Sequence, residues 1–157
     1  MTNKKILFIC LGNICRSPVA DAIFKKTVKE AGLYTIEIDS AGLINFHEGE
    51  PADSRMRRYA LERGYNVDHI SRPLRPHFDF EYYDMIIGMD DQNMAELKNH
   101  SKKVKPRSTF HLMTDFRKAM TYTQVPDPYY GTRKDFELVI DIVEDACNGL
   151  LKHIQNT

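Results

Sequence analysis

The chain has 157 residues, 42% hydrophobic and 28% charged, so its size and composition predict one globular domain over residues 1–157. Because 22 basic residues balance 22 acidic ones, net charge attracts the protein neither to nucleic acid nor to a membrane surface, and we expect neither as a partner. Three cysteines, an odd number, and no apolar run long enough for a signal peptide or a membrane span favour the reducing cytoplasm over secretion.

The first predicted element is a strand at residues 5–9, whose near-continuous apolar run is typical of a parallel strand buried on both faces. A loop, Cys10-Leu11-Gly12-Asn13-Ile14-Cys15-Arg16-Ser17-Pro18, leads from this strand into a helix that Gly32 ends. Ser17 is the expected N-cap of that helix and Pro18 its first residue. The loop therefore lies at a strand-to-helix turn, where doubly wound proteins bind ligands.

This loop has the residues of a phosphate site. Its backbone N–H groups and the helix N-terminus can point at one anion, and Arg16 adds a planar fork that matches two phosphate oxygens. The positive field should hold Cys10 as a thiolate beneath a bound phosphoryl group, placed for in-line attack on phosphorus. Gly12 leaves space for the anion, and Asn13 tolerates a left-handed backbone conformation. Cys10 and Cys15 lack the two-residue spacing of a metal-binding pair, and no nucleotide-binding Gly-Lys-Ser/Thr string follows.

The rest of the chain alternates between strands and helices. We expect strands at residues 36–40, 83–89 and 109–113, and a mostly irregular segment at residues 67–80. We expect helices at residues 52–63 and through Asn93 and Leu97, the second capped by Asp90 or Asp91. The last helix carries an apolar stripe from Phe136 to Ile154. This alternation predicts an α/β fold, a doubly wound, about four-stranded parallel sheet with helices on both faces and the phosphate-binding loop after the first strand.

A second motif, Val125-Pro126-Asp127-Pro128-Tyr129-Tyr130, lies near the other end of the chain. Together the two strings resemble the active-site signature and the general-acid loop of the low-molecular-weight protein tyrosine phosphatases, in the family's order and over nearly the whole chain. The resemblance implies hydrolysis of phosphotyrosine and aryl phosphates through a cysteinyl-phosphate intermediate. Cys10 is then the nucleophile, Arg16 the phosphate clamp and Asp127 the general acid and base. The loop residues that support phosphate binding are Leu11, Gly12, Asn13, Ile14, Cys15 and Ser17.

The resemblance also places a polar network behind the loop. Its expected members are Asn13, Ser40, His69 and Asp21. The family more often has glutamate at the last of these positions, so the shorter Asp21 is a departure from its pattern. Ser17 is expected to donate its hydroxyl to the Cys10 thiolate, which competes with its role as a helix cap.

Two walls are expected to select the substrate. Tyr129 and Tyr130 lie on one side, and Phe46 stands where many family members carry tryptophan or tyrosine. A deep cleft favours phosphotyrosine, because phosphoserine is too short to reach Cys10. Cys15 has two interpretations: it forms a reversible, protective disulfide with Cys10, or it packs under the loop.

The implied chemistry needs neither a cofactor nor a metal ion. The expected partners are a phosphotyrosine-containing protein, as the substrate, and a tyrosine kinase. The protein is expected to be a monomer.

Three other functions remain open. An arsenate reductase of this fold needs additional cysteines, whereas Cys147, on the apolar stripe of the last helix, is the only cysteine outside the loop. Protein-arginine phosphatases of this fold tend to carry threonine where this chain has Ile14. A non-catalytic anion-binding module is disfavoured because the chain has all of Cys10, Arg16, Ser17 and Asp127.

Overall fold

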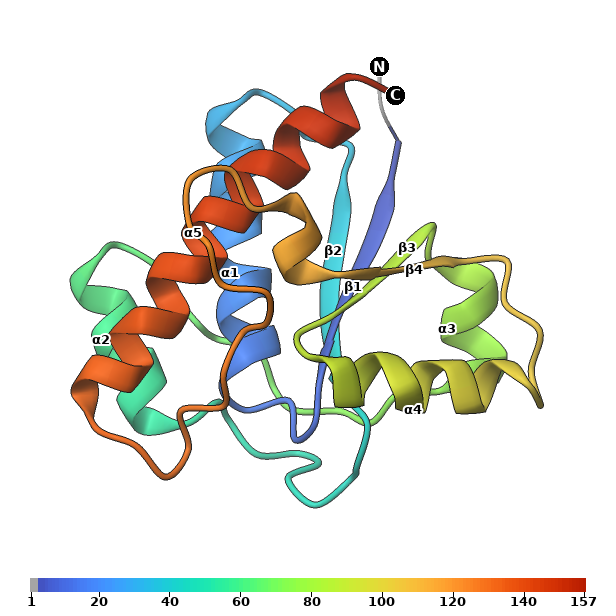
Figure 1. The fold of residues 1–157 in the computed structure, drawn as a ribbon, viewed down its shortest axis with the longest axis horizontal. Coiled ribbons are helices and arrows are strands. Elements are labelled where there is room, and N and C mark those ends of the chain that lie inside the picture. The colour runs from blue at the N-terminus through green and yellow to red at the C-terminus, as the bar shows by residue number, and fades with distance from the viewer. Residues whose placement is uncertain (1–2) are drawn as a thin grey trace.

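A parallel sheet of four strands, in the order β2-β1-β3-β4, forms the centre of the computed structural model, which describes residues 3–157 (Figure 1). The strands are β1 (Lys5–Cys10), β2 (Glu37–Gly42), β3 (Met85–Gly88) and β4 (Thr109–Leu112). In the central strand, Ile6 lies opposite Ile38 on one side and Met85 on the other. The chain turns in opposite directions from β1 to reach β2 and β3, so a crevice is expected at the carboxyl end of β1.

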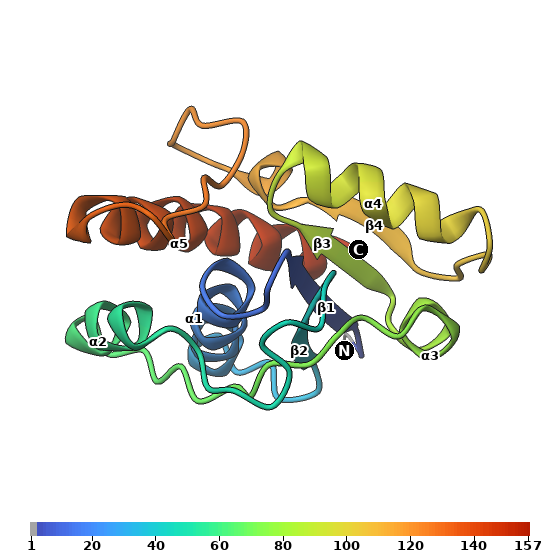
Figure 2. The same cartoon turned by 90° about the horizontal axis from the view of Figure 1, so that it is seen from below.

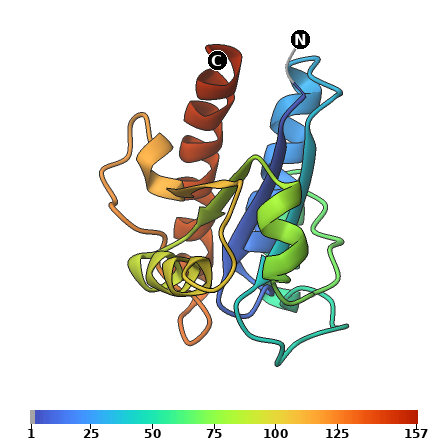
Figure 3. The same ribbon diagram turned by 90° about the vertical axis from the view of Figure 1, so that its right-hand side faces the viewer.

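Helices cover both faces of this sheet, so the predicted fold class is confirmed (Figures 2 and 3). The helices are α1 (Arg16–Glu30), α2 (Ser54–Glu62), α3 (Pro76–Tyr82), α4 (Asp91–Ser101) and α5 (Arg133–Gln155), with a 3-10 turn at Met113–Phe116. Helices α1 and α5 lie on one face, and α3 and α4 lie on the other. No helix within residues 3–157 is both long enough and apolar enough to cross a membrane.

The apolar run of β1 divides between two cores because successive side chains of a strand point to opposite faces. Ile6 and Phe8 pack in the larger core with residues of α1 and α5. Leu7 and Ile9 pack in the smaller core, which includes Phe80 of α3 and residues of α4. Burial on both faces explains why this strand has no polar residue from Ile6 to Ile9 and why it positions the following loop firmly.

The prediction of an irregular segment at residues 67–80 was wrong at its end, where α3 begins at Pro76. Proline suits the first turn of a helix because its φ is already helical and its missing N–H is not needed there. The Asp79 side chain accepts a hydrogen bond from the Arg75 backbone N–H at 2.8 Å, which closes the start of the helix. A helix of seven residues is too short to show the periodicity on which the prediction depended.

Two distant segments meet the β1–α1 loop at the carboxyl end of the sheet. The segment between β2 and α2 and the segment before α5 both reach this end of the molecule (Figure 1). Backbone bonds fix them there: the Leu43 N–H donates to the Cys10 carbonyl at 3.0 Å, and the Val125 N–H donates to the Met89 carbonyl at 2.8 Å. The fold therefore brings the two sequence motifs to one place.

Candidate active site

A cleft of about 250 Å³ lies at the carboxyl end of β1. Its lining comes from three segments: Cys10, Leu11, Gly12, Ile14, Cys15 and Arg16 from the β1–α1 loop, Ile44, Phe46 and His47 from the segment after β2, and Asp127, Tyr129 and Tyr130 from the segment before α5. The structure thus brings together every residue predicted as catalytic or as a cleft wall. Asn13 and Ser17 lie behind the lining, and both are fully buried.

Ser17 contacts the sulfur of Cys10 rather than capping the helix. Helix α1 begins one residue earlier, at Arg16, so the prediction of Ser17 as N-cap was wrong. The Ser17 Oγ lies 2.9 Å from the Cys10 Sγ and accepts a hydrogen bond from the Asn13 Nδ2 at 2.8 Å. Because the oxygen is engaged as an acceptor by Asn13, the single hydroxyl proton is free to donate to the sulfur.

Asn13 holds the loop in its conformation. Its φ of 57° lies in the left-handed region, and it is the only non-glycine residue with positive φ in the described part of the chain. The side-chain amide donates to the Oγ atoms of Ser17 and Ser40, and its oxygen accepts from the His69 Nε2 at 2.8 Å and the Arg72 N–H at 3.0 Å. These four bonds offset the cost of the unusual backbone conformation.

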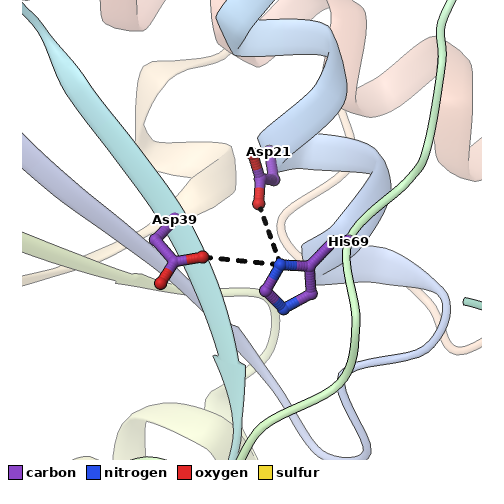
Figure 4. A group of neighbouring side chains, drawn as sticks. All are labelled: Asp21, Asp39 and His69. Carbon is purple, nitrogen blue, oxygen red and sulfur yellow. Dashed lines mark ion pairs between the residues drawn. The ribbon is translucent and has the colours of Figure 1, made fainter. Parts of the chain in front are cut away.

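The predicted network behind Asn13 is present and includes Asp39 as well. Figure 4 shows three of its members, Asp21, Asp39 and His69. The His69 Nδ1 lies 3.6 Å from the Asp21 Oδ2 and 3.4 Å from the Asp39 Oδ1. The Ser40 hydroxyl donates to the Asp21 Oδ2 at 3.2 Å, so the shorter aspartate reaches its expected partner. Burial raises the pKa of Asp21, against the attraction of Lys25, and burial lowers the pKa of His69, against the attraction of both carboxylates.

Asp21, Asp39 and His69 are also the one group in residues 3–157 that places three metal-ligand atoms within 4.8 Å of one another. Both carboxylates already have cationic partners, however. The Lys25 Nζ lies 2.8 Å from the Asp21 Oδ1, and the Arg72 Nε lies 3.2 Å from the Asp39 Oδ2. A divalent ion would have to compete with these two cations, so we interpret the group as an ion-pair network that supports Asn13.

Arg16 is held by a partner that the sequence analysis assigned only as a helix cap. Its guanidinium donates to the Asp90 Oδ2 at 2.7 Å and to the Val125 carbonyl at 3.1 Å. Asp90 also caps α4 by accepting from the Asn93 N–H at 2.7 Å. Burial lowers the pKa of Arg16, but the nearby Cys10 and Asp90 more than offset it, so the net pKa lies above its usual value. The signal for this role was the position of Asp90 just after β3, the strand beside β1.

Asp127 and the two aromatic walls lie nearer to solvent. The Asp127 side chain is half exposed, and its Oδ2 lies 3.9 Å from the Arg16 guanidinium. Its Oδ1 accepts a hydrogen bond from the Tyr129 N–H at 3.1 Å. This bond fixes the carboxylate relative to the backbone of the tyrosine wall. Across the cleft, the Phe46 ring meets His47 edge-on, with 4.8 Å between ring centroids.

Cys15 is buried in the lining of the cleft. Burial, then the negative charges of Asp53 and Cys10, raise the pKa of the Cys15 thiol far above its usual value. All three cysteines are free. The geometry, a sulfur and a guanidinium at one loop with a carboxylate facing them, is that of a cysteine-based phosphate site.

Comparisons with known proteins agree with this site. The sequence pattern of the family described as low molecular weight phosphotyrosine protein phosphatase matches residues 5–157. A low molecular weight protein-tyrosine-phosphatase of Streptomyces coelicolor is 36% identical over 154 residues, which is 96% of this chain and 93% of that protein. The chain therefore belongs to the low molecular weight phosphotyrosine protein phosphatase family.

Solved structures give the same result. A crystal structure of a protein tyrosine phosphatase from Entamoeba histolytica, with Hepes in its active site, matches with a TM-score of 0.92 and 45% identity, over 98% of this chain and 97% of that one. The crystal structure of a Drosophila arginine phosphatase matches with a TM-score of 0.90 and 28% identity, over 98% of this chain and 97% of that one. The shared fold thus accommodates more than one kind of phosphorylated residue.

Proposed function

We propose that the protein removes phosphate from phosphotyrosine in protein substrates, and from aryl phosphates generally, through a cysteinyl-phosphate intermediate. The observation that carries this proposal is the meeting of three groups in one cleft: the Cys10 sulfur, the Arg16 guanidinium and the Asp127 carboxylate. Each group has the chemistry that one part of the reaction needs.

In the first step, the Cys10 thiolate attacks phosphorus, and the sulfur–phosphorus bond forms as the bond from phosphorus to the phenolic oxygen breaks. Arg16 and the loop N–H groups neutralise the charge on the three non-bridging oxygens. Asp127, protonated, gives its proton to the departing phenolate. General acid catalysis of this kind contributes about 10²–10⁴-fold.

In the second step, the ionised Asp127 takes a proton from a water molecule, and the oxygen of that water attacks phosphorus. The sulfur–phosphorus bond breaks, inorganic phosphate leaves, and Cys10 returns to the thiolate. The Ser17 hydroxyl, 2.9 Å from the sulfur, stabilises the anion at both stages. Charge neutralisation by Arg16 and the loop is enough for both steps, so we expect turnover with a chelator present.

The walls of the cleft favour phosphotyrosine as the substrate. Phe46 and Tyr129 line the cleft with aromatic rings from two different segments of the chain, and Ile14 adds an apolar side chain to the lining. An aromatic ring gains from both surfaces, whereas a phosphoguanidine would lose hydration where it lies against the apolar Ile14 side chain. Phosphoarginine is the second candidate substrate, because of the similarity to the Drosophila arginine phosphatase.

We further infer a cytoplasmic, monomeric protein of one domain that acts on phosphotyrosine proteins, with a tyrosine kinase as a partner. Three free, buried cysteines are consistent with a reducing compartment. Sedimentation of the purified protein tests the monomer, and co-purification from lysate with kinase-specific detection tests the partner.

The test of the proposed function is hydrolysis of para-nitrophenyl phosphate at mildly acidic pH, in the presence of a chelator and a thiol reductant. Wild type is compared with Cys10→Ser, and phosphotyrosine, phosphoserine and phosphoarginine are offered as rival substrates. We expect turnover by wild type, loss on the order of 10⁴-fold or more in Cys10→Ser, and preference for phosphotyrosine. Absence of turnover by folded, reduced wild type would leave an anion-binding module, and preference for phosphoarginine would overturn the substrate assignment.

A further inference from the structure

Exposed apolar side chains gather at the mouth of the cleft. Ten large hydrophobic residues are exposed in the described part of the chain, and five of them line this cleft: Leu11, Ile44, Phe46, Tyr129 and Tyr130. Exposed apolar residues that cluster in this way mark surfaces that bind another molecule. A single aromatic ring in the cleft needs only the two aromatic walls, so the other side chains are available to a different part of the substrate.

Three of the five, Leu11, Ile44 and Phe46, come from the phosphate loop and the segment after β2, and they form what we call the apolar shelf. The shelf is joined to the phosphate loop by backbone bonds, since the Ile44 N–H donates to the Leu11 carbonyl at 3.0 Å. Ile44 is 42% exposed and Leu11 is 36% exposed, so both present apolar surface to solvent although their backbones are held.

His47 contacts both the shelf and the phosphate loop. A Cβ atom on Gly12 would lie 3.2 Å from the His47 Cδ2, so the imidazole packs closely on the glycine of the phosphate loop. Its Nδ1 lies 3.3 Å from the Glu50 Oε2, and its ring meets Phe46 edge-on. These contacts set the position of the shelf before a substrate arrives, which lowers the ordering cost of binding.

We propose that the apolar shelf binds an apolar side chain next to the phosphotyrosine of the protein substrate, so that the protein selects sites with an aliphatic neighbour. This inference rests on the proposed function, because it assumes that the phosphorylated ring enters between Phe46 and Tyr129. Burying one aliphatic side chain against Ile44 and Leu11 removes apolar surface from water on both molecules.

The charges around the shelf work against an acidic neighbour. Glu48 and Glu50 are both exposed on the same segment as Ile44 and Phe46. Arg55, whose guanidinium lies 5.4 Å from the centre of the Tyr129 ring, is bonded through two of its nitrogens to Asp53, so its charge is already paired. A substrate with aspartate or glutamate beside the phosphotyrosine therefore meets like charge and gains no apolar contact.

The test compares kcat/KM for phosphotyrosine peptides that differ only in one residue, leucine or aspartate, placed immediately before or immediately after the phosphotyrosine. We expect wild type to prefer leucine over aspartate by about tenfold in at least one of these positions, from partial burial of one aliphatic side chain. Ile44→Asp should remove the preference, and Ile44→Ala should reduce it. Because Ile44 is exposed, neither change should prevent folding.

The matched control is Leu61→Asp, which places the same charge on a residue of α2 that is 65% exposed and outside the cleft lining. This variant should keep the wild-type preference. Equal rates for leucine and aspartate peptides in wild type, or a preference that survives in Ile44→Asp, would overturn the role of the shelf while leaving the phosphatase activity in place. Failure to hydrolyse para-nitrophenyl phosphate would instead overturn the proposed function, and the shelf with it.

Discussion

The floor and the rim of the cleft are built in different ways. On the floor, Cys10, Asn13, Arg16 and Ser17 are buried, and their polar atoms bond to one another, to the network behind Asn13 or, for Arg16, to Asp90. On the rim, Phe46 is 78% exposed and Tyr130 is 96% exposed, and their rings rest mainly on neighbouring rings. Burial and bonding fix the atoms that perform the proposed chemistry, whereas the side chains proposed to choose the substrate are exposed and present their surfaces to it.

This contrast leads to different expectations for substitutions. A change on the floor should lower turnover of every substrate, because all substrates share the phosphoryl group. A change on the rim should alter the ranking of substrates and leave the chemical step nearly intact. Asp127 lies between the two regions, since it is half exposed and yet 3.9 Å from Arg16.

After the loss of the Cys10 nucleophile, the largest effect is expected at Asp127. Asp127→Ala should lower kcat about 10²–10⁴-fold for phenyl phosphate, because phenolate leaves slowly without a proton donor. For para-nitrophenyl phosphate, the loss should be much smaller in the rate of the burst, which is the release of phenolate in the first turnover. The reason is that para-nitrophenolate is a better leaving group. Rapid-mixing kinetics with both substrates check this dependence. An equal loss in the burst for both would show that Asp127 does not protonate the leaving oxygen.

A smaller effect is expected when the partner of Arg16 loses its charge. Asp90→Asn keeps a residue that caps α4 but replaces a charge-assisted bond with a neutral one, so we expect kcat/KM to fall about tenfold for all aryl phosphates. Thermal unfolding should change little. The control is Asp91→Asn, the next residue, whose side chain is exposed. A shift in substrate ranking rather than a uniform loss would place Asp90 with the rim instead of the floor.

On the rim, Phe46→Ala should raise KM for phosphotyrosine peptides about fivefold and leave kcat within about twofold. The physical reason is that an aromatic pair contributes about 1 kcal/mol beyond simple burial. Steady-state kinetics separate the two constants. A fall in kcat as large as the rise in KM would mean that Phe46 also positions the phosphoryl group, and the distinction between floor and rim would fail there.

The smallest effect concerns the support of the tyrosine wall. Asp53 caps α2 and bonds to Arg55, whose guanidinium lies 5.4 Å from the centre of the Tyr129 ring. Although burial alone would raise the pKa of Asp53, the hydrogen bonds from Arg55 and the Met56 N–H lower it below its usual value. A depressed pKa in the folded state means that the carboxylate stabilises the fold above its unfolded pKa and that this stabilisation is lost as pH falls through the folded pKa.

Urea unfolding of wild type and Asp53→Asn as a function of pH checks this sign. The two proteins should differ most near neutral pH and converge below about pH 4, the region where free aspartate titrates. Asp53→Ala should lower the free energy of unfolding by about 1 kcal/mol over a broader pH range, because it removes the helix cap as well. A difference between wild type and Asp53→Asn that grows as pH falls would contradict the assignment.

The sequence predicted the parts of the site that are local in the chain. The loop from Cys10 to Pro18 and the string around Asp127 can each be recognised from consecutive residues. The apolar run before Cys10 indicated a buried strand. Asp90 was assigned only as a cap, because its bond to Arg16 depends on β3 lying beside β1 across 74 positions of sequence. Asp39 was missed for the same kind of reason, since its contact with His69 arises from an edge strand and a distant loop.

The role of Ser17 shows how two local signals can compete. A serine before proline is a good helix-cap pattern, and it led to the wrong start for α1. The structure starts the helix at Arg16 because the turn is shaped by Asn13 in the left-handed region, with its side chain bonded on both ends. A prediction from neighbouring residues cannot include those partners, because they are distant in the sequence.

The most direct test of the central claim is to trap the phosphoryl group on the protein. Asp127→Ala is mixed with para-nitrophenyl phosphate and quenched within the first turnover, and the digested peptides are analysed by mass spectrometry. Catalysis through Cys10 predicts one phosphoryl group on the peptide that contains Cys10, carried by sulfur, and none on that peptide from Cys10→Ser. A phosphoryl group on another residue, or undiminished turnover by Cys10→Ser, would contradict catalysis through Cys10.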